Sequence, residues 1–143
     1  MLGLALVLCG LVMVGSASAA TGQETVITPE QIPGIIRVEA EDLLSLVEQE
    51  KKLVIIDSRI RMDRRQGYIE GSLSLPDNET SCAALERVLS NRERPVLFYC
   101  NGVHCGRSGV AAGIALKCGY TRLYWYRNGF EDWKQKGYPF LKQ

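Results

Sequence analysis

Two cysteines and an arginine lie close together in one short stretch of this 143-residue chain. Cys100 follows the apolar run 95–99, and Cys105 and Arg107 come shortly after it. The run predicts a strand and residues 110–117 predict a helix, so a loop joins the end of a strand to a helix. Backbone N–H groups of such a loop and the positive end of the helix bind anions and lower the pKa of a thiol. Cys100 is therefore predicted to be a thiolate nucleophile.

The rest of the chain alternates short apolar runs with segments of helical periodicity. Strands are predicted at 34–38, 52–57, 72–76, 95–99 and 121–126, and helices at 39–49, 82–89, 110–117 and 129–136. Strands that alternate with helices predict an α/β fold with a parallel sheet covered on both faces. Ligands of such sheets bind at the carboxyl ends of the strands, and both Cys100 and Asp57 fall there.

The first 20 residues predict an exported protein. They contain no charged side chain, residues 2–8 begin an apolar core, and Ala17-Ser18-Ala19 supplies the small residues of a signal-peptidase site. We expect a signal peptide at 1–19, a linker at 20–33 and a single domain at 34–143, in a protein exported to a bacterial periplasm. The apolar stretch is also long enough to span a bilayer, so an uncleaved anchor is the alternative.

The composition restricts the class of partner. The chain carries 17 basic and 16 acidic side chains and has no basic block. This balance gives no reason to expect a nucleic acid or an anionic membrane surface as a partner. A membrane would be a partner only if the N-terminal segment stays uncleaved.

Export also changes what the cysteines can do, because disulfides persist in oxidising compartments. Cys82, Cys100, Cys105 and Cys118 follow the predicted signal peptide, and two bridges among them could pair in three ways. A chain of this size can build a core without disulfides. We therefore expect Cys82 and Cys118 to be small buried residues on helices.

Four motifs, in this order, resemble the rhodanese-like domain family. Asp57-Ser58-Arg59 resembles its Asp-x-Arg at the end of the second strand, and 67–76 resembles its Gly-His-Ile-x-Gly-Ala-x-Asn-Ile-Pro. Phe98-Tyr99-Cys100 resembles the strand before the catalytic cysteine, and 128–139 resembles the closing signature. Six residues separate Cys100 from Arg107, two more than in the family's commonest loop, and Tyr68 replaces the usual His.

The resemblance implies a three-layer fold around a central, parallel, five-stranded sheet, and sulfur transfer without a cofactor or metal. Cys100 would be catalytic, taking sulfane sulfur from a small donor such as thiosulfate as a persulfide. A thiol, cyanide or a partner protein would accept it. Loop amides would hold the anions and Arg107 a sulfonate-like group. The implied substrate-binding residues are Asn101, Gly102, Val103, His104, Cys105, Gly106 and Arg107, and Asp57 and Arg59 would support them by pairing.

Other interpretations stay open. The protein could be a sulfur carrier or partner-docking module that turns over poorly alone. It could be a thiol–disulfide redox protein in which Cys105 resolves a persulfide or a sulfenic acid on Cys100. Cys105 could instead be a loop residue with no chemical role. Cys100, His104 and Cys105 could also bind a metal, although the sequence offers no convincing fourth ligand. Arg107 could be an exposed residue of the first helical turn, and His104 a solvent-facing loop residue. A phosphatase-like loop is disfavoured, because such loops usually place five residues between Cys and Arg.

Overall fold

The predicted strands form one sheet, which confirms the α/β prediction. The computed structural model describes residues 27–143, so the predicted signal peptide or anchor at 1–19 lies outside the described residues. All strand pairs are parallel, in the order β1-β5-β4-β2-β3. The strands are β1 (Ile36–Arg37), β2 (Val54–Asp57), β3 (Leu73–Ser74), β4 (Val96–Tyr99) and β5 (Leu123–Tyr126). The helices are α1 (Ala40–Gln49), α2 (Arg61–Arg65), α3 (Cys82–Val88), α4 (Arg107–Lys117) and α5 (Gly129–Gln135), with a 3-10 turn, η1 (Asp77–Glu79).

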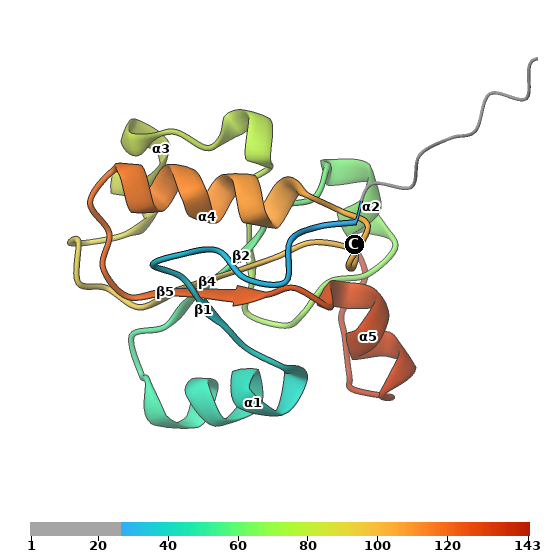
Figure 1. Ribbon diagram of the computed structural model, residues 1–143. Coiled ribbons are helices and arrows are strands. Elements are labelled where there is room, and N and C mark those ends of the chain that lie inside the picture. Colours follow the sequence, from blue (N-terminus) through green and yellow to red (C-terminus); the bar gives the residue numbers. More distant parts are fainter. Residues whose placement is uncertain (1–26) are drawn as a thin grey trace, which may run out of the picture.

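Helices cover both faces of the sheet, which makes the domain three layers thick (Figure 1). α3 and α4 lie on one face, and α1 and α5 lie on the other. Successive side chains of β2 pack on opposite faces of the sheet. Val54 and Ile56 pack with α3 and α4, whereas Ile55 packs with α1 and α5. Within residues 27–143, no helix combines the length and the apolar character needed to cross a bilayer.

The central pair of strands brings the candidate residues to one edge of the sheet. Every residue of β2 and β4 is buried, as the two apolar runs predict. The parallel register places Asp57 opposite Tyr99, the residue before Cys100. Asp57 and Cys100 therefore share the carboxyl edge of the sheet.

Two helical segments escaped prediction. α2 consists of charged residues around Met62, so no apolar periodicity marks it, and its buried residue is Arg64. η1 is a short turn directly after Pro76. α4 begins at Arg107, three residues before the expected start, because the polar residues 107–109 continue the helix.

The expectation that Cys82 and Cys118 are separate buried residues is wrong. They form a disulfide with Cα atoms 5.5 Å apart. Cys82 is an exposed residue at the start of α3, and Cys118 caps the end of α4. The packing of α3 and α4 on one face brings these ends together, and a local pattern cannot reveal a contact across 36 residues.

Candidate active site

Cys100 directly follows β4, and its side chain faces a second sulfur. A disulfide joins Cys100 to Cys105, with Cα atoms 6.1 Å apart. The loop closes on itself because the backbone N–H of Cys105 donates to the carbonyl of Gly102 at 2.9 Å. In this form the Cys105 N–H is therefore used in a hydrogen bond within the loop and is not available to bind an anion. Cys100 is only 1% exposed, whereas Cys105 is partly exposed.

The start of α5 fixes the base of the loop. The backbone N–H groups of Phe130 and Glu131 donate to the carbonyls of Cys100 (2.9 Å) and Asn101 (2.8 Å). This close approach requires a glycine at position 129, where φ is +64° and a Cβ would lie 2.4 Å from the Cys100 carbonyl oxygen. The turn before α5 thus sets the path of the chain beyond the candidate nucleophile.

Thr28 holds the middle of the loop. Both the backbone N–H (2.9 Å) and the Oγ1 hydroxyl (2.8 Å) of Thr28 donate to the Val103 carbonyl. Arg127 in turn donates to the carbonyls of Thr28 and Pro29, each at 2.9 Å. The part of the expected linker that is described, 27–33, therefore packs on the domain beside the loop, a contact that its polar composition does not reveal.

Asp57 and Arg59 pair with each other, as the sequence suggested. Arg59 Nε and Nη2 donate to the two carboxylate oxygens of Asp57 at 2.8 and 2.7 Å, and both residues are buried. Arg59 Nη1 reaches the side-chain oxygen of Asn101 at 3.4 Å, and Asn101 Nδ2 donates to Asp63 at 3.0 Å. The Phe130 ring lies under the guanidinium, with Cζ 4.4 Å from the ring centroid. These contacts position the first residue of the loop.

Sequence reasoning missed two further members of this buried cluster. Arg64 Nη1 donates to Asp57 (3.1 Å) and Ser72 (2.9 Å), and the Tyr99 hydroxyl donates to Asp57 at 2.8 Å. Burial and the charge of Asp57 raise the pKa of Tyr99, so its phenol stays neutral. Burial lowers the pKa of Arg59, but the hydrogen bonds and charge of Asp57 outweigh it and raise that pKa. The Asp57 carboxylate is thus paired with two guanidiniums, those of Arg59 and Arg64.

The remaining predicted residues are spread along the loop and its helix. Gly106 caps α4, and Arg107 donates to Asp77 of η1 at 2.7 Å with its side chain 42% exposed. This placement favours the interpretation of Arg107 as an exposed residue of the first helical turn. His104 is exposed, as expected for a solvent-facing loop residue. Within residues 27–143, no group of three or more His, Cys, Asp and Glu side chains is arranged to hold a metal ion.

The loop lies between two hollows at the carboxyl edge. A polar cavity of about 180 Å³ is lined by Asn101 at the start of the loop, together with Arg59, Asp63, Gln66, Phe130, Glu131 and Lys134. An apolar groove of about 310 Å³ is lined by Gly106 at the end of the loop, together with Ile27, Thr28, Pro29, Ile32, Gly109, Val110 and Trp125. One cavity therefore adjoins the first residue of the loop and the other its last residue, and neither is lined by Cys100 or Cys105.

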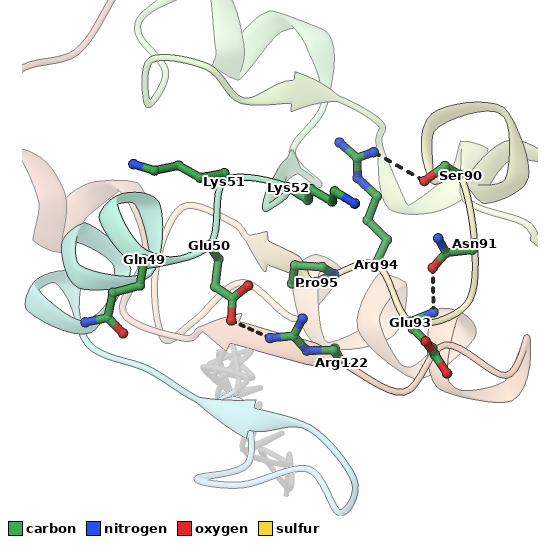
Figure 2. Close-up of a pocket in the computed structure, with 10 residues that line it drawn as sticks. All are labelled: Gln49, Glu50, Lys51, Lys52, Ser90, Asn91, Glu93, Arg94, Pro95 and Arg122. Atoms are coloured by element: carbon green, nitrogen blue, oxygen red, sulfur yellow. Dashed lines mark hydrogen bonds and ion pairs between the residues drawn. The ribbon is translucent and has the colours of Figure 1, made fainter.

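A separate cavity of about 340 Å³ lies at the opposite edge of the sheet (Figure 2). Its walls come from the residues before β2, β4 and β5, and no cysteine lines it. Glu50 pairs with Arg122, and Arg94 donates to Ser90 at 3.3 Å. The cysteine pair lies at the other edge of the sheet.

A family model of the rhodanese-like domain matches residues 39–136. The chain belongs to the rhodanese-like domain family. The matched segment runs from α1 to α5, contains every strand of the sheet except β1, and includes Asp57, Arg59, Cys100 and Cys105. It thereby confirms the resemblance seen in the motifs.

The proteins similar to this rhodanese-like domain match it at low sequence identity. It is 25% identical over 109 residues to the uncharacterised protein YibN of Escherichia coli, across 76% of this chain and 71% of that protein. A rhodanese-like domain from Anabaena sp. superposes with a TM-score of 0.65 at 22% identity, covering 75% of this chain and 79% of that one. The polysulfide-sulfur transferase homodimer from Wolinella succinogenes superposes with a TM-score of 0.63 at 18% identity, covering 77% and 80%. At these identities the structures establish the fold alone.

Proposed function

We propose that this rhodanese-like protein is a sulfurtransferase in which Cys100 carries sulfane sulfur as a persulfide. The Cys100 thiolate attacks the outer sulfur of a donor such as thiosulfate and releases sulfite. A thiol, cyanide or a partner protein then takes the sulfur from the persulfide. The cycle needs no cofactor, because the cysteine itself carries the transferred atom.

One observation carries the proposal: Cys100 directly follows a central strand and begins a loop that three separate parts of the chain hold in place. α5 binds the carbonyl of Cys100, Thr28 binds that of Val103, and Arg59 binds the side chain of Asn101. A nucleophile fixed in this way loses little entropy when it meets its substrate.

The disulfide adds a condition to this reaction. Because the sulfur of Cys100 is bonded to that of Cys105, this form has no thiolate that could attack a donor. Reduction of the bond must therefore precede sulfur transfer. The same bond supports the second candidate function, a thiol–disulfide redox protein that exchanges electrons through Cys100 and Cys105.

Thiocyanate formation from a donor and cyanide tests the proposal, with thiosulfate and inorganic polysulfide tried separately on reduced protein. We expect the wild type to form thiocyanate and Cys100→Ser to form none above the uncatalysed rate. Cys82→Ser is the matched control, because it removes a cysteine far from the loop and should keep the activity. Equal activity in the wild type and Cys100→Ser would contradict the proposal. Disulfide reductase activity without thiocyanate would favour the redox function.

We also propose that the protein is exported, in line with the predicted signal peptide. The support is the pair of disulfides, since such bonds persist in oxidising compartments and are rare in the cytosol. Fractionation of cells that produce the full chain tests this directly. Recovery in the periplasmic fraction without residues 1–19 is expected, and recovery of the intact chain in the cytosol would contradict export.

A further inference from the structure

We propose that Cys105 takes part in the reaction itself, by displacing the transferred sulfur from Cys100 as sulfide. The Cys100–Cys105 disulfide is then the product of each turnover. This inference rests on the proposed sulfur transfer, because it needs a persulfide on Cys100. It makes the protein a sulfide-releasing enzyme that is reset by an external dithiol.

The geometry of the loop supports this role for Cys105. The Cα atoms of Cys100 and Cys105 are 6.1 Å apart, within the usual range for a disulfide. The contacts that hold the loop do not involve either sulfur: α5 binds the carbonyls of Cys100 and Asn101, and Thr28 binds that of Val103. We therefore expect the loop to keep its path after reduction, with the two sulfurs still neighbours.

The turn itself also brings Cys105 back toward Cys100. The Cys105 N–H bonds the Gly102 carbonyl at 2.9 Å, and α4 begins two residues later with Arg107 bound to Asp77. The loop is thus fixed at its start, at its turn and at its exit. A thiol held this way attacks a neighbouring sulfur far faster than a thiol free in solution.

The displacement balances as follows. Cys100 thiolate and thiosulfate give the Cys100 persulfide and sulfite. The Cys105 thiol loses its proton and its sulfur attacks Sγ of Cys100, which breaks the bond to the outer sulfur. The outer sulfur leaves with the bonding electron pair, takes the proton and departs as hydrosulfide. The two cysteines are oxidised to the disulfide and the sulfane sulfur is reduced to sulfide.

The difference in exposure between the two cysteine residues indicates how the enzyme is reset. Cys100 is 1% exposed while Cys105 is partly exposed, so a thiolate from solution reaches the Cys105 sulfur first. A protein or small-molecule dithiol would form a mixed disulfide there and release the Cys100 thiolate. The second thiol of the reductant then closes its own disulfide and frees Cys105. Each turnover consumes one dithiol and one sulfane sulfur and produces one sulfide.

A single turnover of the full chain separates this inference from the proposed function. Protein is reduced, freed of reductant and mixed with excess thiosulfate, and sulfite and sulfide are both measured. The cysteine pair is followed in the tryptic peptide 93–107, which contains Cys100 and Cys105 but neither Cys82 nor Cys118. The variants are Cys105→Ser, Cys105→Ala and Cys100→Ser, each checked for an unchanged circular dichroism spectrum.

We expect the wild type to release one sulfide for each sulfite and to end with peptide 93–107 lighter by two hydrogen atoms. Both Cys105 variants should release sulfite but no sulfide above the Cys100→Ser background, and should retain the extra sulfur. Sulfite release with a stable persulfide in the wild type would overturn this inference and leave the proposed function standing. If neither the wild type nor the Cys105 variants released sulfite, the proposed function itself would fail.

Discussion

The guanidinium of Arg59 forms two parallel hydrogen bonds with the carboxylate of Asp57, at 2.8 and 2.7 Å, in the interior of the domain. The same guanidinium reaches Asn101 at 3.4 Å and the carbonyl of Gly67 at 2.8 Å. Arg59 therefore links the end of β2 to the first residue of the cysteine loop. A group that both supports the fold and positions the loop should affect stability and activity together.

Arg59→Lys tests this link. A lysine keeps the charge but cannot form the two parallel bonds to Asp57 while also reaching Asn101. We expect the free energy of unfolding to fall by about 2 kcal/mol, the size of a lost hydrogen bond to a buried charged group. Thiocyanate formation should fall with it.

Arg61→Lys is the matched control for this change. Arg61 also pairs with a carboxylate, Glu79, but its side chain is 62% exposed. The free energy of unfolding should change by no more than about 0.5 kcal/mol in urea denaturation. Equal losses in the two variants would contradict the role given to Arg59.

Gly129→Ala should displace the base of the loop. The left-handed backbone at this position alone costs an alanine about 1–2 kcal/mol. In addition, the new Cβ would meet the Cys100 carbonyl oxygen at 2.4 Å, so the hydrogen bond from Phe130 must be lost. We expect lower stability and a reduced rate of sulfite release in a single turnover.

Gly113→Ala, in the middle of α4, is the control for the glycine experiment. Nothing lies within 4 Å of a Cβ at this position, and alanine favours a helix. This variant should gain about 0.5–1 kcal/mol in the free energy of unfolding and keep its activity. If Gly129→Ala behaved like Gly113→Ala, the turn before α5 would not control the loop.

The sequence predicted the parts of this protein that have a local signal. The apolar runs that became β2 and β4 located the sheet, and their ends located Asp57 and Cys100. The missed features depend on tertiary contacts. Arg64 lies in a charged segment that reads as a solvated surface, yet it is buried against Asp57 and Ser72. Thr28 lies in the segment predicted to be a linker, yet it holds the loop at Val103.

The Cys82–Cys118 bond should contribute to stability and not to catalysis. It closes a loop with a sequence separation of 36 residues. Loop-closure entropy for that length corresponds to about 4 kcal/mol. The double variant Cys82→Ser/Cys118→Ser should lose about this much in the free energy of unfolding under oxidising conditions. Its rate of thiocyanate formation on reduced protein should match that of the reduced wild type.

Reducing conditions supply the control for this bond. After reduction of both proteins, the wild type and the double variant should unfold at the same urea concentration. A wild type that stays as stable after reduction as before would show that the bond adds nothing to the stability of the fold.

Alkaline pH should destabilise the domain through Tyr99. Burial and the charge of Asp57 raise the pKa of this phenol above its ordinary value of 10.0, so the unfolded chain loses the proton first. The unfolded state therefore binds fewer protons above about pH 10, and the free energy of unfolding falls as the pH rises, by up to about 1.4 kcal/mol per pH unit for one such group. Burial and Asp132 also raise the pKa of Tyr126, so this phenol adds to the same trend.

Tyr99→Phe should be less stable at pH 8, because Asp57 loses a hydrogen bond, but should lose stability less steeply above pH 10. Urea denaturation at a series of pH values measures both effects. Parallel curves for the wild type and Tyr99→Phe above pH 10 would show that this phenol does not titrate with unfolding.

The mass of the reduced Cys105→Ser variant after exposure to thiosulfate tests most directly whether Cys100 carries sulfur. Without the second loop thiol, the persulfide should remain on the protein. We expect peptide 93–107 to gain the mass of one sulfur atom, and the gain to disappear after treatment with cyanide and in Cys100→Ser. An unchanged mass at Cys100, or the same gain in Cys100→Ser, would contradict a persulfide at the end of β4.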